Sequence, residues 1–357
     1  MTGRSPHEDR NFADLVELHR AELHAHCYRM LGSVHDADDA LQETLVRAWR
    51  GAAGLREPGS ARSWLYTIAT NVCLTELERR KRRVLPHDFG PAAEPHTPPG
   101  APLVESTWLE PYPDEAMGLG AGRAAPEASY EQREAVELAF VAAAQHLAAN
   151  QRAVLLLREV LGFSAQETAN MLDTTVASVN SALQRARAAV RERVPERTQQ
   201  VTLAALGDGS LRKLIDRYVD AWERCDVPAF AGLLAEDATF AMPPLSTWYT
   251  PRDTIATWAG RSAMSGAWRW RAVVTSANAQ PALAFYAWDE AEHAYLPFAL
   301  NVLSLGDSGL VSDVTAFIVR AADSPDPSDY RNFPRQAMNE RQLTGTFSRF
   351  GLPGRLN

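Results

Sequence analysis

A proline-crowded, acidic stretch at residues 85–126 interrupts the first half of the chain and prevents one helical core from running through it. Helical periodicity with almost no proline covers residues 12–83, and it resumes over residues 131–193. The stretch between them cannot bury enough apolar surface to order itself, so we interpret it as a linker. The sequence therefore predicts two separate helical blocks.

The remainder of the chain has a different character. Two expected helices, at residues 211–224 and 227–234, are followed by runs rich in aromatic and β-branched residues. These runs predict strands at 238–242, 269–277, 282–288, 295–305 and 310–320. Helices that precede strands favour an α+β unit.

The length of 357 residues is compatible with two or three domains. We expect an all-α helical bundle, a linker, a second all-α domain, a short linker, an α+β domain and an irregular tail. Their expected bounds are 10–86, 87–130, 131–196, 197–209, 210–322 and 323–357.

Composition narrows the classes of function. The three cysteines, Cys27, Cys73 and Cys225, are far apart and form no CxxC pair, which argues against a disulfide framework and a zinc site. We expect no metal and no cofactor. No signal-peptide core or long apolar run is present, so we expect a cytoplasmic protein with no membrane partner. The net charge of −8 does not exclude nucleic acid, because a local basic stripe is sufficient for binding.

The first block contains an amphipathic helix at residues 36–50. Its expected apolar stripe includes Leu45 and ends at Ala48 and Trp49. The opposite face carries Asp38, Asp39, Gln42, Glu43 and Arg47. Such a face is either a solvated surface or a docking surface for a larger partner.

A second helical segment follows at residues 62–83 and ends in five consecutive basic residues, Arg79 to Arg83. Cations complement the negative end of a helix dipole. Five in a row exceed what a helix end needs, which favours contact with phosphate.

The second block has a helix-turn-helix pattern at residues 163–189. Ser164 and Glu167 form a capping box that starts the first helix, and Asp173 suits the tight turn. The second helix begins near Val176 and carries polar residues opposite its apolar stripe. These are Ser178, Asn180, Ser181, Gln184, Arg185 and Arg187.

Together, DADDALQETLVRAW, RSWLYTIATN, the basic helix end and HLAANQRAVLLLREVLG before the helix-turn-helix resemble the extracytoplasmic-function sigma factors of the sigma-70 family. This resemblance implies core RNA polymerase as a partner, through its β′ clamp and β subunits, and promoter DNA as a second partner. It places the polymerase face on the five polar residues of the 36–50 helix. It places −35 contacts on the six polar residues of the helix-turn-helix, and −10 contacts on Ser60, Arg62, Ser63, Thr67, Asn71, Arg79, Arg80 and Arg83.

The sequence departs from many family members at Asn180 and Ala182, where basic residues are common. The −35 preference therefore cannot be transferred from relatives. We expect the acidic segment 108–114 to thread the polymerase channel used by RNA.

The segment LIDRYVDAWERCDVPAFAGLLAEDATFAMPP resembles SnoaL-like domains, which fold as a cone of curved sheet around a pocket. This resemblance implies regulation in cis and a small-molecule ligand. The aromatics could line such a pocket or fill a core. The candidate pocket residues are Tyr218, Trp222, Trp248, Tyr249, Trp258 and Phe298.

We expect no enzymatic activity, because the titratable candidates form no convincing spaced set. They are Tyr218, Asp237, Tyr249, His293 and Asp313. The sequence favours a sigma factor for promoter-specific initiation. Two alternatives are a one-component ligand-responsive DNA-binding regulator and a SnoaL-like enzyme that carries DNA-binding modules. The tail at 349–353 either anchors on a partner or packs against its own domain.

Overall fold

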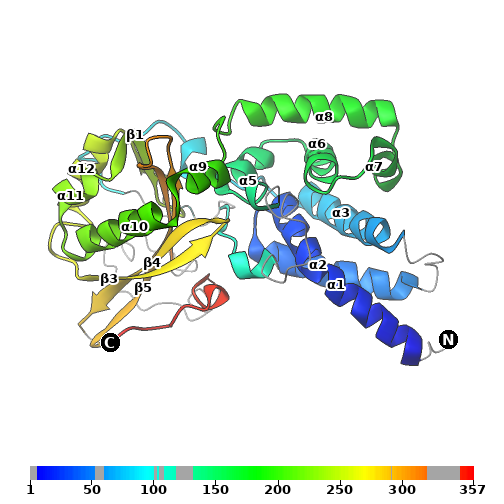
Figure 1. Ribbon diagram of the computed structural model, residues 1–357, viewed down its shortest axis with the longest axis horizontal. Coiled ribbons are helices and arrows are strands. Elements are labelled where there is room, and N and C mark those ends of the chain that lie inside the picture. The colour runs from blue at the N-terminus through cyan, green and yellow to red at the C-terminus, as the bar shows by residue number, and fades with distance from the viewer. Residues whose placement is uncertain are drawn as a thin grey trace. The chain divides into compact units, whose positions relative to one another are not determined.

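The chain divides into two units in the computed structural model (Figure 1). The structure describes residues 6–52, 60–99, 103, 108–117, 132–290, 292–319 and 346–357, with side chains from residue 12 onward. One unit combines Met1–Arg83 with Asp114–Glu196, and the other combines Val84–Pro113 with Arg197–Asn357. Among the described helices, none has the length and apolar character that a membrane crossing requires.

The first helical block is a bundle of α1 (Pro6–Leu31), α2 (Val34–Gly51) and α3 (Ala61–Arg79). The Ser33 hydroxyl caps α2 by accepting from the Asp36 amide, which satisfies one free donor of the first turn. Tyr28 and Leu65 are fully buried in the bundle. Trp49 was expected on the buried stripe, but 53% of its surface is exposed. This prediction is wrong because the buried stripe continues through the fully buried Ala48, and Trp49, one residue farther round the helix, lies outside it.

A short 3-10 helix, η4 (Asp114–Met117), lies within the expected linker and precedes the second block, whose longer helices among the described residues follow. They are α5 (Leu138–Gln145), α6 (Ala149–Leu155), α7 (Ala165–Met171) and α8 (Val176–Arg191), with a π-helical turn η6 (Leu156–Val160) after α6. The predicted capping box is present, since Ser164 and Glu167 bond reciprocally. Asp173 adopts φ +48° in the turn, and Thr175 caps α8. Val179, Leu183 and Ala186 of α8 pack on the helices beneath.

The two helical blocks pack against each other within the first unit. Helix α3 contacts both α6 and α7, and α1 contacts α5 and α6. The predicted linker between the blocks therefore does not keep them apart in this state.

The second unit contains one six-stranded sheet with the order β2-β1-β6-β5-β4-β3. Only the β1–β6 pair is parallel among the described strands; the others run antiparallel. The strands are β1 (Leu234–Ala241), β2 (Trp248–Tyr249), β3 (Trp270–Ala277), β4 (Gln280–Asp289), β5 (Ala294–Leu305) and β6 (Val311–Ile318). The α+β prediction is confirmed in outline: all five expected strands are present, with bounds shifted by a few residues at most.

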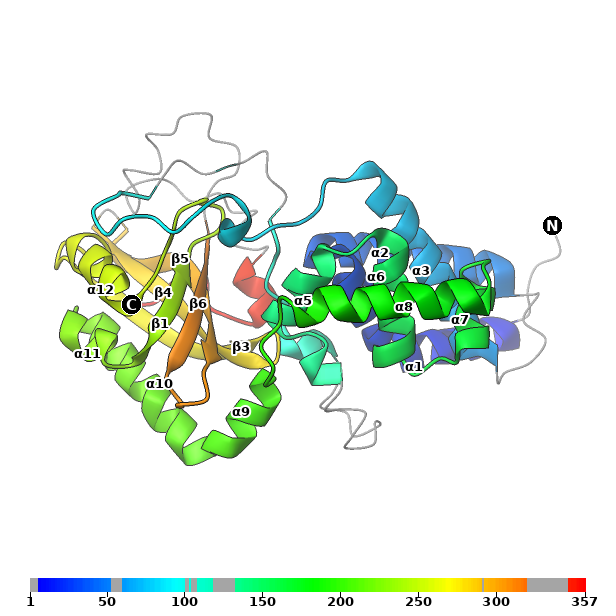
Figure 2. The ribbon, with the colours of Figure 1, turned by 90° about the horizontal axis from the view of Figure 1, so that it is seen from above.

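Helices α10 (Asp208–Glu223), α11 (Val227–Ala231) and α12 (Arg252–Arg261) lie along one side of this sheet (Figure 2). Their apolar faces meet the inner strand residues in one core, where Trp222 packs edge-to-face on Trp270 with ring centroids 6.0 Å apart. Neither α12 nor β2 was predicted from the sequence.

The expected short linker at 197–209 is largely helical instead. Helix α9 (Gln199–Leu206) is bound to the sheet by two buried glutamines. Gln199 bonds both the amide and the carbonyl of Leu305, at 2.7 and 2.9 Å. Gln200 donates to the Ala279 carbonyl at 2.8 Å. Side-chain amides that satisfy buried backbone groups fix a helix in place, so this joint is an integral part of the domain.

The first part of the predicted inter-block linker also packs on the second unit. The Trp248 indole donates to the Gly90 carbonyl at 3.0 Å, and the Tyr249 hydroxyl donates to the Thr97 carbonyl at 2.7 Å. Farther along, Tyr112 is fully buried, and its amide donates to Asn278 Oδ1 at 2.8 Å. The expectation that this stretch stays without order is therefore wrong for its described residues. Within the linker, residues 100–102, 104–107 and 118–130 lie outside the described residues.

The end of the chain packs on its own domain. Phe347 is buried against the Tyr286 ring, with centroids 5.2 Å apart, and the Tyr286 hydroxyl donates to the Pro353 carbonyl. Leu356 pairs with Tyr295 of β5 through two backbone hydrogen bonds. Of the two alternatives for the tail, the packed one is correct. The preceding segment, 320–345, lies outside the described residues.

Candidate nucleic-acid interface

The polar face of α2 is exposed, as expected for a docking surface. Asp39, Gln42 and Glu43 are exposed, and Arg47 bonds Glu43 one turn away at 2.7 Å. Asp38 is half-buried and accepts from His24 of α1 at 3.1 Å. The same side of the bundle adds apolar surface that sequence reasoning missed, since Val46 is 42% and Trp49 53% exposed. Val46 and Trp49 lie next to charged residues in the sequence, and this pattern could have indicated that they are exposed.

The beginning of α3 contains most of the expected −10 residues. The Ser63 hydroxyl donates to the Ser60 carbonyl at 3.0 Å, and the Thr67 hydroxyl donates to the Ser63 carbonyl at 2.8 Å. Asn71 is exposed. Arg62 differs from these residues, because it donates to the Leu161 carbonyl of the second block at 3.1 Å. Four of the five thus lie on α3 or directly before it with polar groups at the surface, and Arg62 is engaged elsewhere.

The basic end of α3 divides into engaged and free side chains. Arg80 and Arg83 both form ion pairs with Asp36 at the start of α2. Arg82 bonds His146 Nδ1 at 3.0 Å. Arg79 and Lys81 are exposed and have no partner among the described side chains. Of the four arginines expected to contact −10 DNA (Arg62, Arg79, Arg80 and Arg83), only Arg79 can meet phosphate without breaking a bond to a described residue.

Asp36 is the side chain that the sequence did not single out. Burial alone would raise the pKa of its carboxyl. Arg83 and Arg80 counteract burial through their positive charges and hydrogen bonds, and the net result is a lowered pKa. The side chain of Arg83 is only 11% exposed. The pair therefore joins α2 to the segment after α3 inside the block, which is a structural role.

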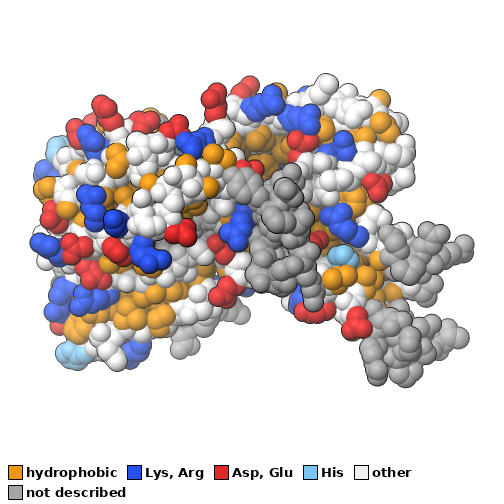
Figure 3. Space-filling model, in the orientation of Figure 1, with side chains coloured by type: hydrophobic (Ala, Val, Ile, Leu, Met, Phe, Trp, Pro, Cys, Tyr) orange, Lys and Arg blue, Asp and Glu red, His pale blue; other side chains and the backbone are white. Residues whose placement is uncertain are grey.

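Helix α8 presents a continuous exposed face. Ser178, Asn180, Ser181, Gln184 and Arg185 are all exposed, opposite the buried Val179 and Leu183. Arg187 pairs with Glu159 at 2.6 Å, whereas Arg185 has no partner among the described residues. Figure 3 shows basic side chains over the C-terminal half of α8 and uncharged ones over its N-terminal half. The helix can thus offer small polar groups at one end and cations at the other.

The candidate pocket residues of the second unit do not form one open cavity lining. Tyr218, Trp222, Tyr249 and Trp258 are buried in the aromatic core, and the Tyr249 and Trp258 rings stack at 4.8 Å. Burial raises the pKa of Tyr218 far above its usual range, so the phenol stays neutral. Trp248 and Phe298 are partly exposed: Trp248 packs on His87, and Phe298 packs on Trp268 and Trp270 at the edge of the core. The Nε1 of Trp258 is buried without a hydrogen-bond partner.

Titratable groups in the second unit are equally dispersed. Asp313 binds the hydroxyls of Thr239 and Thr315, and His293 is exposed at a turn with φ +46°. Among the side chains that the structure describes, no three His, Cys, Asp or Glu residues gather as metal ligands would.

Comparison with known proteins matches the two helical blocks separately. Residues 15–83 match the model of sigma-70 region 2, and residues 137–190 match the model of sigma-70 region 4. The ECF RNA polymerase sigma factor SigG of Mycobacterium tuberculosis is 41% identical over 323 residues, which cover 89% of this chain and 84% of the relative. The chain belongs to the extracytoplasmic-function sigma factor family. Neither of the two alternative functions is favoured by these matches.

The match to this sigma factor family extends to the second unit. The crystal structure of the M. tuberculosis sigma factor SigJ covers 92% of this chain and 100% of its own, with a TM-score of 0.55 at 19% identity. A likeness at this identity shows the fold alone. A SnoaL-like protein of Burkholderia thailandensis aligns over 31% of the chain with a TM-score of only 0.25. The sigma factor therefore carries a sheet-containing C-terminal domain as SigJ does, and the specific cone fold stays a prediction.

Proposed function

We propose that this sigma factor binds core RNA polymerase and directs promoter-specific initiation, with its C-terminal domain modulating that activity in cis. The observation that carries the proposal is the pairing, in one chain, of an exposed docking helix α2 with an exposed reading helix α8. Each alone is a common surface. Together, in sigma-70 regions 2 and 4, they supply both requirements of initiation, a polymerase contact and a DNA reader.

The proposed polymerase contact combines charge and apolar surface on α2. Asp39, Gln42 and Glu43 form a polar rim beside Val46 and Trp49. Exposed aromatics next to a charged rim are typical of protein interfaces, where they are buried on binding. Basic side chains without a partner among the described residues, such as Arg79 and Arg185, are then left for promoter DNA. The protein acts in the cytoplasm, where both partners are found.

Run-off transcription with purified core polymerase tests the proposal. Wild-type protein should produce defined transcripts from a genomic promoter library, whereas Asp39→Lys/Glu43→Lys should bind core about tenfold more weakly through charge reversal. A matched control is Asp216→Lys/Asp220→Lys on α10, which makes the same charge change outside α2. Equal core affinity for the α2 variant and wild type would refute the docking site, and absence of any transcript would refute the function.

The position of the linker supports the proposed modulation in cis. We infer that segment 108–114 enters the RNA channel of polymerase in the initiation complex. In the free protein, Tyr112 of this segment is buried and hydrogen-bonded to Asn278. One segment cannot occupy both places, so the C-terminal domain competes with polymerase for it. Tethering makes this competition effective even when the intrinsic affinity is low.

A small-molecule ligand of the C-terminal domain is part of the same proposal. Its site would involve the buried aromatic cluster around Trp222 and Trp258, where the Trp258 Nε1 could donate to a ligand oxygen. Because these side chains pack against one another, a ligand must displace some of them. It then changes sigma activity only if it binds one linker state better than the other.

A further inference from the structure

An acidic side chain from outside the reading helix α8 holds one of its arginines. Arg187 of α8 donates to the Glu159 carboxylate at 2.6 Å. Glu159 lies in η6, the π-helical turn that follows α6, and such turns are frequent at functional sites. Both side chains are exposed, Arg187 to 47% and Glu159 to 37%. The pair therefore lies at the surface, where another anion can compete with the carboxylate for the arginine.

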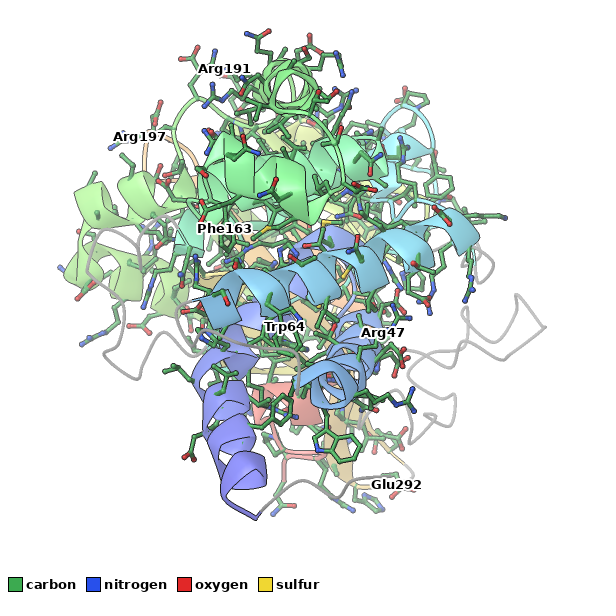
Figure 4. The ribbon with its side chains drawn as sticks, turned by 90° about the vertical axis from the view of Figure 1, so that its right-hand side faces the viewer. Arg47, Trp64, Phe163, Arg191, Arg197 and Glu292 are labelled. Atoms are coloured by element: carbon green, nitrogen blue, oxygen red, sulfur yellow. The ribbon has the colours of Figure 1, made fainter. Side chains whose placement is uncertain are left out.

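Arg187 shares a face of α8 with residues that are proposed to read the −35 element. Four exposed residues of this helix follow one another at spacings of four, three and four: Asn180, Gln184, Arg187 and Arg191. Residues at these spacings lie on one stripe of a helix. Figure 4, in which α8 is seen end-on, shows Arg191 at the outer surface of the helix. Arg187 thus belongs to the proposed reading face although its guanidinium is bound to Glu159.

The position of Arg187 along α8 indicates which part of the DNA it faces. The N-terminal residues of a recognition helix contact base edges in the major groove. Arg187 follows Asn180 by seven residues, which is about 10 Å along the helix axis. At that distance from the base-reading end, the group opposite the helix is the phosphate backbone at the edge of the groove. A free arginine there contributes attraction to any DNA sequence.

The Glu159 carboxylate opposes this contact in two ways. It occupies the guanidinium, and its hydrogen bond and negative charge raise the pKa of Arg187. If Arg187 turns to phosphate, Glu159 is left as an unpaired negative charge close to the DNA backbone, which repels it. Exposed ion pairs contribute little to stability, so the fold does not depend on this one.

We propose that Glu159 limits the affinity of α8 for DNA by holding Arg187 away from phosphate. The helix also carries Asn180 and Ala182 rather than basic residues. Arg185, which has no partner among the described residues, is then the cation that α8 offers to the −35 element. This inference rests on the proposed promoter reading by α8, and it names the residue that keeps the sequence-independent part of that reading weak.

Three variants separate this role from a general effect of charge. Glu159→Gln removes the negative charge and keeps the shape of the side chain. Glu192→Gln is the matched control, because Glu192 follows α8 directly, is exposed and faces another arginine, Arg193, at 3.7 Å. The double variant Glu159→Gln/Arg187→Gln shows whether the effect of Glu159 passes through Arg187.

Holoenzymes assembled from full-length variants and purified core polymerase are titrated onto two labelled duplexes, with fluorescence polarisation as the readout. One duplex carries a promoter found by run-off transcription, and the other has the same composition in scrambled order. Contacts of core itself are common to all variants and cancel in the comparison. Glu159→Gln should bind both duplexes about fivefold more tightly at about 50 mM salt. The gain should fall below about twofold at about 200 mM, because one more phosphate contact steepens the logarithmic salt dependence by about 0.9.

Equal affinities of Glu159→Gln and wild type would overturn the inference, as would the same gain in Glu192→Gln. A gain that persists in the double variant would overturn it too, because Glu159 would then act without Arg187. So would a gain confined to the promoter duplex, which indicates a base contact instead of phosphate. Failure of the proposed function gives a different result, since wild-type protein then forms no holoenzyme with core.

Discussion

Neighbouring arginines at the end of α3 have different environments although the sequence presents them as one basic run. Arg80 and Arg83 pair with Asp36, and Arg82 bonds His146. The basic run Arg79–Arg83 thus contributes less unpaired positive charge than its five basic residues suggest. A buried acid that engages two cations stabilises the block and, at the same time, selects which side chains remain for phosphate.

Asp36→Asn should lower the free energy of unfolding by about 3 kcal/mol, because it removes the carboxylate charge with which the nearly buried Arg83 pairs. Asp39→Asn on the same helix, where the carboxyl is exposed, should change it by less than about 0.5 kcal/mol. Urea unfolding of the full chain at pH 7 measures both. Similar midpoints for the two variants would contradict the structural role of Asp36.

His26 makes the first block sensitive to acid. It is fully buried beside Thr70, and burial lowers its pKa from 6.5 to about 3. The unfolded chain therefore binds a proton that the folded chain does not, so stability is complete above pH 6.5 and falls as the pH drops toward 3. At pH 5 the loss is about 2 kcal/mol relative to pH 7.

His26→Gln keeps a polar partner for Thr70 and removes this titration. Urea unfolding at pH 7 and pH 5 should show a pH dependence about 2 kcal/mol smaller than in wild type. His35→Gln, at an exposed position on α2, should retain the wild-type dependence. The interpretation fails if His26→Gln and His35→Gln lose stability equally on acidification.

At the scale of elements, the helix-turn-helix was predicted almost completely. The capping box at Ser164 and the left-handed conformation of Asp173 depend only on residues close in sequence, so a local pattern is sufficient to predict them. Helix α9 and strand β2 were missed for the opposite reason. Their positions depend on partners distant in sequence, such as Leu305 for Gln199 and Phe240 for Tyr249. No local pattern encodes such pairs.

The same division applies to the candidate site. Periodicity correctly separated the exposed side chains of α8 from the buried ones. It could not show that Arg187 pairs with Glu159 from another helix, or that Arg62 contacts Phe163. An amphipathic pattern reports which face is polar, whereas the partner of each polar group is a tertiary property.

Arg185 and Arg187 should therefore differ when each is changed to Ala. Arg185 is free to pair with a base or a phosphate, so its loss should cost about 1–3 kcal/mol of −35 binding. Arg187 must first leave Glu159, and its loss should cost less. Transcription by the holoenzyme from promoters with intact and altered −35 elements measures this. Equal losses for the two variants would contradict the assignment of Arg185 as the principal reader.

At the scale of the whole molecule, the chain passes between its two units three times, after Arg83, after Pro113 and after Glu196. The linker segment Val84–Pro113 thus belongs to the same unit as the C-terminal domain, whereas the segments before and after it in sequence belong to the first unit. Asn278, with φ +56°, provides one of its anchors.

Asn278→Gly preserves this backbone conformation and removes the side-chain acceptor for Tyr112. Loss of about 1 kcal/mol of hydrogen bonding should release the linker roughly fivefold more often and raise transcript output at limiting core by a similar factor. Ala279→Gly in the same turn, also at positive φ, is the control and should behave as wild type. Unchanged output from Asn278→Gly would show that linker docking does not limit activity.

In the cis regulation that we propose, docking of the linker also determines how far the two promoter readers can move apart. The segment Val84–Pro113 belongs to the second unit, so its contour is taken up as long as it stays bound there. Once released, these residues could extend to roughly 100 Å, at about 3.3 Å per residue. In the cis regulation that we propose, the C-terminal domain therefore sets the length of the tether, and an initiation factor with its tether shortened engages one promoter element but does not span both.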